Sequence, residues 1–131
     1  MIVADASVIV EFLLGTRQGE DATRYLTGSG PVQVPALIDA EVAQALRRLV
    51  AGGMLDEPRG RASLEILQDM PLHRHPIHPL LPRLWQLRHT LTAYDACYVA
   101  LAEALDCPLV TFDRGIVAAS GHFASMVVPE H

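Results

Sequence analysis

Met1-Ile2-Val3-Ala4-Asp5-Ala6-Ser7 opens the chain, and this stretch decides how the rest of it is organised. Four apolar residues run directly into an acid, which is typical of a short buried strand that ends at Asp5. Residues 6–14 are apolar and stop at Gly15, so they are predicted to form a helix. A second apolar strand followed by an acid and a short helix recurs at 109–120. Two such units indicate a sheet whose strands are parallel.

The rest of the chain continues this alternation. Further helices are predicted at 18–26, 36–51, 56–70, 80–89 and 92–105, and further strands at 32–34, 72–77 and 126–128. The clearest helix, 36–51, has an apolar stripe at 3.6-residue spacing made of Ile38, Val42, Ala45, Leu46 and Leu49. We predict one domain over residues 1–131, with a three-layer α/β/α fold around a mostly parallel central sheet. Ligands of such sheets bind beyond the carboxyl ends of the strands.

Composition narrows the classes of function. All ten basic residues are arginine, so mechanisms that need a lysine are excluded, among them Walker-A nucleotide binding and Schiff-base chemistry. The net charge of −5 excludes a nucleic-acid binder that works through bulk positive charge. No apolar run approaches the roughly 18 residues of a membrane span, and no basic segment opens the chain, so we expect a cytoplasmic protein with no membrane partner. Cys97 and Cys107 are expected to be small buried apolar residues.

Four acids lie in apolar surroundings, unlike the other acids of the chain. Asp5 and Asp113 each follow a predicted strand, and Glu41 and Asp95 each lie near the start of a predicted helix. All four are therefore expected at one edge of the sheet. Each also has an ordinary interpretation, because Asp5 and Asp113 can cap helices, Asp95 fits a capping box with Thr92, and Glu41 can be solvated.

A cluster of carboxylates is costly unless a cation sits within it. Ligands that are all oxygen suit Mg²⁺ or Mn²⁺, which also bind phosphate oxygens. One or two such ions at a phosphodiester activate water and offset the charge that develops during hydrolysis. No Ser/His/Asp or Cys/His set is needed for this chemistry.

The motifs resemble those of one family. The family opens with an apolar run, then Asp, then a hydroxyl residue two positions later, and Ile2-Val3-Ala4-Asp5-Ala6-Ser7 matches this pattern. Glu41-Val42 matches the family's second acid. The third and fourth motifs are matched by Leu91-Thr92-Ala93-Tyr94-Asp95-Ala96 and Leu109-Val110-Thr111-Phe112-Asp113. In order and over nearly the whole chain, these resemble the motifs of PIN-domain nucleases, most closely the VapC-type toxins of toxin–antitoxin pairs.

The resemblance implies an endoribonuclease that depends on Mg²⁺ or Mn²⁺, forms a homodimer and is inhibited by a small VapB-like antitoxin. It implies that Asp5, Glu41, Asp95 and Asp113 are the catalytic, metal-binding acids. Ser7 and Thr111 are candidates for hydroxyls that orient the carboxylates, with ordinary roles at a helix start and in a strand as the alternative. Phe112 is bulkier than the residue that many relatives have there, which affects the expected wall of the substrate site rather than the acids.

Two arginines are candidate contacts to RNA phosphate or to the antitoxin. Arg48 lies two helical turns after Glu41 on the same side, whereas Arg47 points to the opposite face. Arg114 follows Asp113 directly. The alternative for each is a structural salt bridge.

Other features carry weaker hypotheses. His73 and His75 would share one face of a strand near His78, which permits a metal pair, but a proline-flanked edge segment is the preferred interpretation. Leu81 and Trp85 are expected in the core or in a dimer interface. Because aromatic residues make up only 5% of the chain, RNA recognition is expected to use shape and arginine contacts rather than base stacking.

The sequence thus predicts a metal-dependent endoribonuclease toxin. The alternative is a PIN-like module that binds RNA or a protein without cleaving it. A different metal phosphoesterase is a third possibility, but no His-rich second metal site accompanies the four acids in this sequence. The residues leave open which RNA is cut, the antitoxin's identity and whether one or two ions bind.

Overall fold

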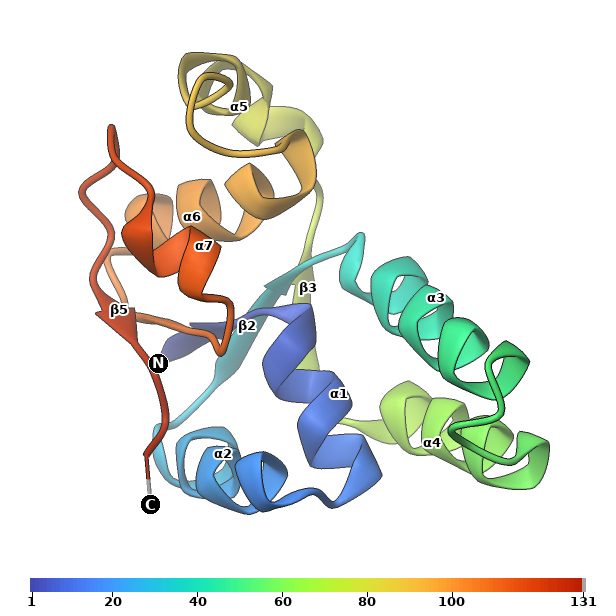
Figure 1. Ribbon diagram of the computed structural model, residues 1–131. Helices are drawn as coiled ribbons and strands as arrows, with labels where there is room; N and C mark the ends of the chain where they lie inside the picture. Colours follow the sequence, from blue (N-terminus) through green and yellow to red (C-terminus); the bar gives the residue numbers. More distant parts are fainter. Residues whose placement is uncertain (131) are drawn as a thin grey trace.

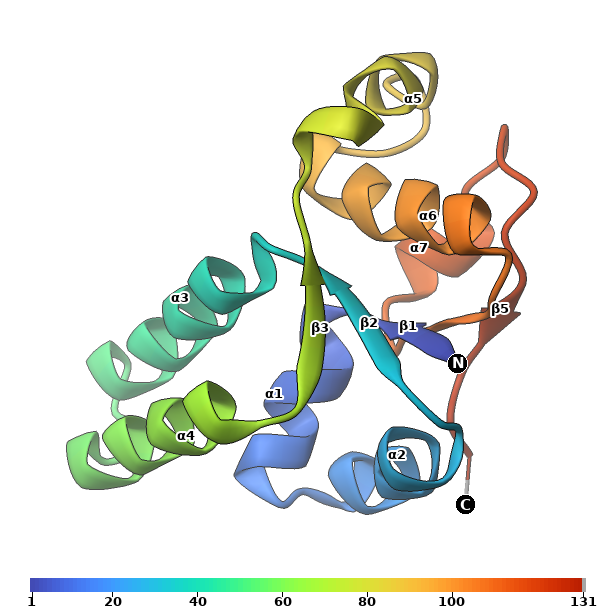
Figure 2. The same cartoon turned by 180° about the vertical axis from the view of Figure 1, so that it is seen from behind.

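The computed structural model describes residues 1–130 and contains a central sheet of five parallel strands in the order β3-β2-β1-β4-β5. The first strand of the chain is therefore the middle of the sheet (Figures 1 and 2). The strands are β1 (Ile2–Ala4), β2 (Val32–Pro35), β3 (Leu72–His75), β4 (Leu109–Val110) and β5 (Met126–Val127). The predicted α/β/α fold class with a parallel sheet is confirmed.

Helices lie on both faces of this sheet. One face is covered by α6 (Ala93–Leu105), which packs on β1, β2 and β4, and the short 3-10 helix η1 (His78–Leu80) and α5 (Leu81–Gln86) lie outside α6. The other face carries α1 (Ala6–Leu14) and α2 (Arg17–Gly28), which pack on each other (Figure 1).

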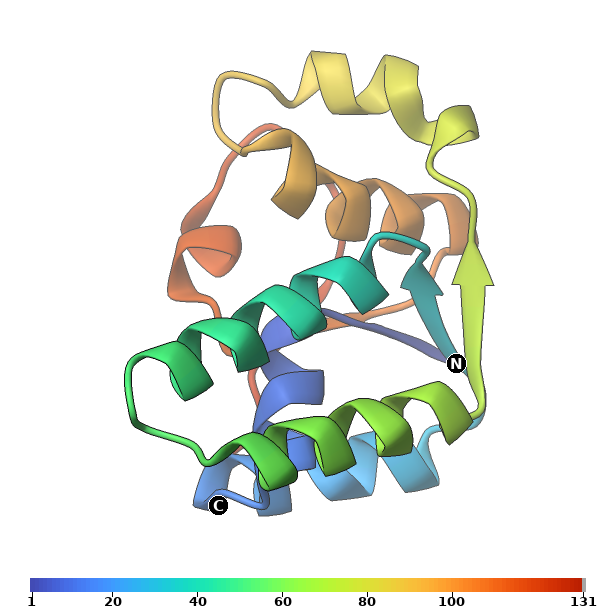
Figure 3. The ribbon, with the colours of Figure 1, turned by 90° about the vertical axis from the view of Figure 1, so that its right-hand side faces the viewer.

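Two further helices form a hairpin beside the sheet. In Figure 3, α3 (Ile38–Ala51) and α4 (Glu57–Asp69) run side by side in opposite directions, and both contact α1. The last helix, α7 (Arg114–Ala118), follows β4 and returns the chain toward β5. The start of α3 and the start of α7 therefore approach the carboxyl edge of the sheet from different sides.

The core is built from small and aliphatic residues, as the low aromatic content requires. All three residues of β1 are buried, and so is the middle of α6 from Ala96 to Ala102. Small side chains let α6 lie close to the sheet, and Tyr98 is the largest side chain in the fully buried set. Cys97 and Cys107 are both buried free thiols, as predicted.

Several boundaries differ from the sequence-based prediction. Helix α2 runs on through residues 27 and 28, because an exposed glycine lowers helix propensity without ending a helix by itself. β4 ends at Val110 rather than Phe112. The expected placement of Leu81 and Trp85 in the core is wrong, since they are 50% and 69% exposed. Only the opposite side of this segment is buried, through Leu84 and Leu87.

None of the helices within residues 1–130 has the length and apolar character required to cross a bilayer.

Gly19 sets the spacing between α1 and α2. A β-carbon at this position would lie 2.1 Å from the backbone oxygen of Glu11 and 3.1 Å from the Cα of Phe12. Backbone atoms cannot yield to a side chain as a flexible rotamer can, so only glycine permits the two helices to approach this closely.

Gly19→Ala is expected to lower the free energy of unfolding by about 3 kcal/mol, because α2 must move away from α1. The matched control is Gly28→Ala, also in α2, where a β-carbon meets no atom within 4 Å. That variant should stay within about 1 kcal/mol of wild type. Urea unfolding followed by circular dichroism gives both values, and equal stabilities of the two variants would contradict this account of the α1–α2 contact.

Arg83 and Glu103 join α5, α6 and the segment before β5. Arg83 donates from Nε and Nη2 to the two oxygens of Glu103 at 2.8 and 2.9 Å. It also donates to the Gly121 carbonyl, while the Phe123 N–H donates to Glu103. Burial opposes ionisation of Glu103, but the Arg83 guanidinium and the Phe123 N–H outweigh it and lower the pKa of the carboxyl. This pair attaches α5 to the rest of the molecule.

Glu103→Gln is expected to destabilise the protein by about 2 kcal/mol at pH 7, since it weakens a bidentate charged contact around a buried carboxylate. A lowered pKa stabilises the fold above the unfolded value of about 4.3, and that contribution is lost as pH falls through the folded pKa. The difference between variant and wild type should therefore shrink as pH falls below about 4. Glu57→Gln is the control, because its i,i+4 pair with Arg61 is exposed and should contribute less than about 0.5 kcal/mol.

Candidate metal-binding and nuclease site

Asp5 is the central acid of the site and lies directly after the middle strand. It is 3% exposed, and its N–H donates to the Val110 carbonyl at 3.2 Å. Its Oδ1 accepts from the Ser7 hydroxyl at 2.6 Å and from the Val8 N–H at 3.2 Å, and its Oδ2 accepts from the Thr111 hydroxyl. The carboxylate thus caps α1 and is fixed by one hydroxyl from the first turn of α1 and one from the residue after β4.

The two hydroxyls also bind the backbone that follows β4. Ser7 Oγ accepts from the Phe112 N–H at 3.0 Å, and Thr111 Oγ1 accepts from the Asp113 N–H at 2.9 Å. Each hydroxyl has a single proton, and both protons are directed at Asp5. The hydroxyls therefore bridge one carboxylate to the turn that carries Asp113.

The register of the sheet corrects one detail of the prediction. Ala4 pairs with Val110, so the residue beside Asp5 at the sheet edge is Thr111. Asp113 was expected to follow its strand directly, but it lies two residues later as the exposed N-cap of α7, where its Oδ1 accepts from the N–H groups of Gly115 and Ile116. The reason is that β5 is very short and pairs only with Leu109 and Val110.

Glu41 approaches from α3 and is half-buried. Its Oε1 accepts a short hydrogen bond from the hydroxyl of Tyr98, which is 1% exposed within α6. Sequence analysis did not identify Tyr98 as a site residue. A signal was present, because a tyrosine within an apolar helix needs a partner for its hydroxyl, and Tyr98 lies one turn after the third acidic motif.

Asp95 lies in the first turn of α6 and is half-buried. Its N–H donates to the Thr92 hydroxyl at 3.1 Å, which confirms Thr92 as the N-cap of this helix. The N-cap interpretation is also correct for Asp5 and Asp113. Capping uses part of each carboxylate, so it does not preclude a second role for the same side chain.

The negative charges of the four acids influence one another's pKa. Burial raises the pKa of Asp5, opposed by its three donors, and the charge of Asp113 raises it further. Burial also raises the pKa of Glu41, as do the charges of Asp95 and Asp5, and burial together with Asp113 raises that of Asp95. These repulsions link the acids in a ring, from Asp5 to Asp113 to Asp95 to Glu41 and back. We call these four residues the acidic ring.

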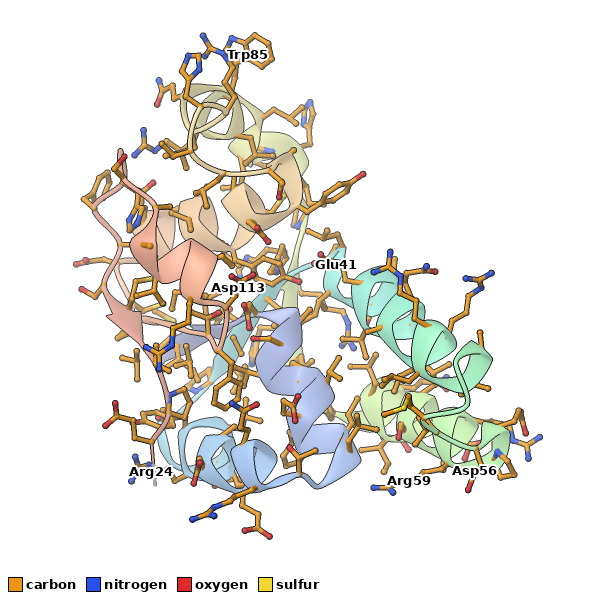
Figure 4. All side chains as sticks on the ribbon, viewed as in Figure 1. Arg24, Glu41, Asp56, Arg59, Trp85 and Asp113 are labelled. Atoms are coloured by element: carbon orange, nitrogen blue, oxygen red, sulfur yellow. The ribbon has the colours of Figure 1, made fainter. Side chains whose placement is uncertain are left out.

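The labelled side chains in Figure 4 show how the ring is assembled. Glu41 at the start of α3 and Asp113 at the start of α7 lie near the middle of the molecule, above the first turn of α1. Within residues 1–130, no arginine or histidine forms an ion pair with a member of the ring. The ring is therefore a concentration of negative charge without a cation from the chain.

The donor set fits a hard divalent cation, because it consists of carboxylate oxygens with no sulfur or nitrogen. In their present conformations, however, no three His, Cys, Asp or Glu side chains among residues 1–130 are grouped closely enough to hold a metal ion. Asp5 is buried and held by three donors, whereas Asp113 is exposed and Asp95 half-buried. The metal-binding roles of the four acids stay a prediction.

The other candidates fall outside the acidic ring. His73, His75 and His78 belong to no metal-binding group within the described chain, and the ring of His75 instead contacts the buried amide oxygen of Gln33 at 2.5 Å. β3 is at the edge of the sheet, as its prolines suggested. Neither Arg48 nor Arg114 forms an ion pair among residues 1–130, so the salt-bridge alternative is wrong for both.

Comparison with known proteins identifies the family. The PIN domain family model matches residues 2–121. Ribonuclease VapC1 of Mycobacterium tuberculosis is 43% identical over 120 residues, which cover 91% of this chain and 90% of that protein. The chain belongs to the VapC branch of the PIN-domain family. The acidic ring of this VapC-type protein is assembled from all four motifs on which the resemblance rested.

Solved structures agree with this fold at low sequence identity. The crystal structure of PAE2754 from Pyrobaculum aerophilum has a TM-score of 0.73 and 21% identity, covering 95% of this chain and 81% of that one. A toxin–antitoxin complex from Klebsiella pneumoniae has a TM-score of 0.63 and 20% identity, with 90% and 91% coverage. At these identities the likeness is one of architecture.

Thr111→Val is expected to destabilise the protein by about 2 kcal/mol at pH 7, because Oδ2 of the buried Asp5 carboxylate loses its donor. Loss of that donor raises the pKa of Asp5 further, so stability should be lost as pH rises from the unfolded value of about 3.9. The destabilisation should therefore be smaller at pH 3 than at pH 7.

Thr111→Ser retains the hydroxyl and should be more stable at pH 7 than Thr111→Val. Thr90→Val is the control for loss of an exposed hydroxyl, since Thr90 donates only to the Ser120 carbonyl. Thermal unfolding across pH measures all three variants. Equal stability of the valine and serine variants at position 111 would show that the Thr111 hydroxyl does not support Asp5.

Proposed function

We propose that this VapC-type protein is an endoribonuclease toxin that hydrolyses RNA phosphodiesters with Mg²⁺ or Mn²⁺ held by Asp5, Glu41, Asp95 and Asp113. The observation that carries the proposal is the acidic ring, in which four carboxylates repel one another at the carboxyl edge of the sheet. The chain is 43% identical to Ribonuclease VapC1 over 120 residues, and this likeness supports RNA as the substrate. A bound divalent ion would activate water and offset charge on the phosphate.

The side chains divide the work according to their burial. Asp5 is fixed by three donors and would serve as the rigid ligand. Asp113 caps α7 through Oδ1, which would leave its Oδ2 for the ion. Glu41 accepts the Tyr98 hydrogen bond on Oε1, which would leave Oε2 to bind the ion.

The alternative is a PIN-like module that binds RNA or a protein without cleaving it. A binding module has no need for a ring of mutually repelling carboxylates, whereas a cation-dependent hydrolase does. The presence of all four acids therefore favours the enzyme.

Two partners belong to the same proposal. A VapB-like antitoxin would inhibit by placing a basic side chain in the acidic ring, in keeping with the net charge of −5, and the Klebsiella relative of this fold is itself a toxin–antitoxin complex. A homodimer would cover the exposed Leu81 and Trp85 side chains of α5. Trp85 projects at the far end of the molecule from Asp56, the N-cap of α4 (Figure 4). A cytoplasmic location remains a prediction.

Asp113→Asn is expected to reduce Mg²⁺-dependent RNA cleavage more than about 100-fold, since loss of a direct ligand should exceed the 10–100-fold cost of losing a residue that supports one. The matched control is Asp56→Asn. Asp56 is likewise an exposed N-cap that accepts a backbone N–H, and it caps α4, far from Glu41 and Asp113 (Figure 4). Asparagine caps well at both positions, so neither helix should melt.

Thermal unfolding with and without Mn²⁺ separates ligation from capping. Bound metal stabilises the fold by mass action, and Asp113→Asn should melt at least as high as wild type without metal but gain less from Mn²⁺. Asp56→Asn should gain as much as wild type. If purified wild-type protein cleaves no RNA with either ion, or if Asp113→Asn cleaves at the wild-type rate, the proposed function is wrong.

A further inference from the structure

A groove of about 660 Å³ runs along α3 from the acidic ring. It is lined by Leu37, Ala40, Glu41, Gln44, Ala45, Arg48 and Tyr94. Because Glu41 belongs to both, the groove is continuous with the ring. Its volume is within the usual range for small-molecule sites, and its lining combines a cation, an amide, a phenol ring and an aliphatic floor.

Two tyrosines of α6 connect this helix with the groove, since Tyr94 lines it and Tyr98 donates to Glu41. Tyr94 and Tyr98 are four residues apart, the spacing that brings side chains onto one face. Tyr98 is buried and donates to Glu41, whereas Tyr94 is 66% exposed and makes no hydrogen bond among the described residues. An exposed ring that lines the same groove as Glu41 provides an open face for another planar group.

Arg48 is the cation of the groove. It lies seven residues after Glu41, about 10 Å along the helix axis, and it is exposed and without an ion pair within residues 1–130. Arg47, its neighbour in sequence, lines a different groove between α3 and α4. Arg48 thus places a guanidinium that has no ion pair within residues 1–130 along the groove that leads from the ring.

We propose that this groove binds the nucleotide next to the cleaved phosphodiester, with its base stacked on Tyr94 and its phosphate bound by Arg48. The inference rests on the proposed function and narrows its substrate to unpaired RNA, because bases inside an A-form helix cannot stack on a side chain. Stacking tolerates any base, so the groove provides affinity rather than sequence selection. This proposal departs from the expectation drawn from composition, which was recognition by shape and arginine contacts rather than by base stacking.

The test measures binding and cleavage of short single-stranded RNA oligonucleotides that carry 2-aminopurine at each position in turn. Binding is followed by fluorescence anisotropy without divalent metal, so that it does not depend on activity. Stacking on Tyr94 should quench 2-aminopurine at one position in the wild-type complex, and Tyr94→Ala should abolish this quenching and raise Kd about 10-fold. Tyr94→Phe keeps the ring and should retain both.

The role of Arg48 is tested against a control variant that loses the same charge elsewhere on α3. Arg48→Ala should raise Kd about 10-fold and flatten its dependence on salt, whereas Arg47→Ala removes the same charge from the same helix outside the groove and should change Kd less than twofold.

In cleavage, Tyr94→Ala should raise KM with kcat within about twofold of wild type, because the contact is made equally in the ground and transition states. A merely structural role for Tyr94 would not produce this pattern or the loss of quenching.

Failure of this inference is distinguishable from failure of the proposed function. If wild-type protein cleaves RNA but Tyr94→Ala leaves Kd, KM and quenching unchanged, the subsite is wrong and the nuclease stands. If Tyr94→Ala and Arg48→Ala weaken only the binding of an antitoxin, the groove is a protein-binding surface and the proposal is overturned. If no RNA is cleaved, equal binding of oligonucleotides by wild type and Tyr94→Ala still overturns it.

Discussion

The buried carboxylate of Asp5 is the constraint on which the rest of the structure depends. A charge taken out of water at the end of the middle strand is costly unless donors surround it. Ser7, Val8 and Thr111 supply them, and both hydroxyls have only one proton to give. The chain on either side must therefore fold so that α1 begins at Asp5 and β4 ends beside it. The contact between Thr111 and Asp5 joins residues 106 positions apart in sequence.

This constraint also places the other acids. The Ser7 and Thr111 hydroxyls accept the N–H groups of Phe112 and Asp113, so the turn that carries Asp113 is attached to the same carboxylate. Tyr98 performs the corresponding role from α6 by donating to Glu41. Asp5 and Glu41 are thus oriented by hydroxyl groups, Asp113 caps α7, and Asp95 lies in the first turn of α6. Hydrogen bonds to the carboxylates of Asp5, Glu41 and Asp113 stabilise a ring of like charges that has no counter-charge within residues 1–130.

Other contacts of the fold lie outside the acidic ring and support the elements that carry it. Gly19 allows α1, the helix that Asp5 caps, to lie tightly against α2. The Arg83–Glu103 pair attaches α5 and the segment before β5 to α6, and so supports the edge of the sheet on which β4 depends. Along α3, successive arginines serve different surfaces, with Arg48 in the groove that leads from the ring and Arg47 between α3 and α4.

Local sequence alone determined the helices and strands, because apolar spacing and capping residues act over a few positions. It predicted α1 from Ala6 to Leu14 ended by Gly15, and α6 capped by Thr92. It also singled out Asp5, Glu41, Asp95 and Asp113, since an acid in apolar surroundings is conspicuous without any structure. Only the tertiary structure decided that Thr111 rather than Asp113 lies beside Asp5, because strand register depends on pairing with β1 and β5. It alone revealed that Tyr98 orients Glu41, that Trp85 is exposed and that Tyr94 and Arg48 share a groove. Those facts depend on which faces of distant helices meet, and no local pattern encodes that.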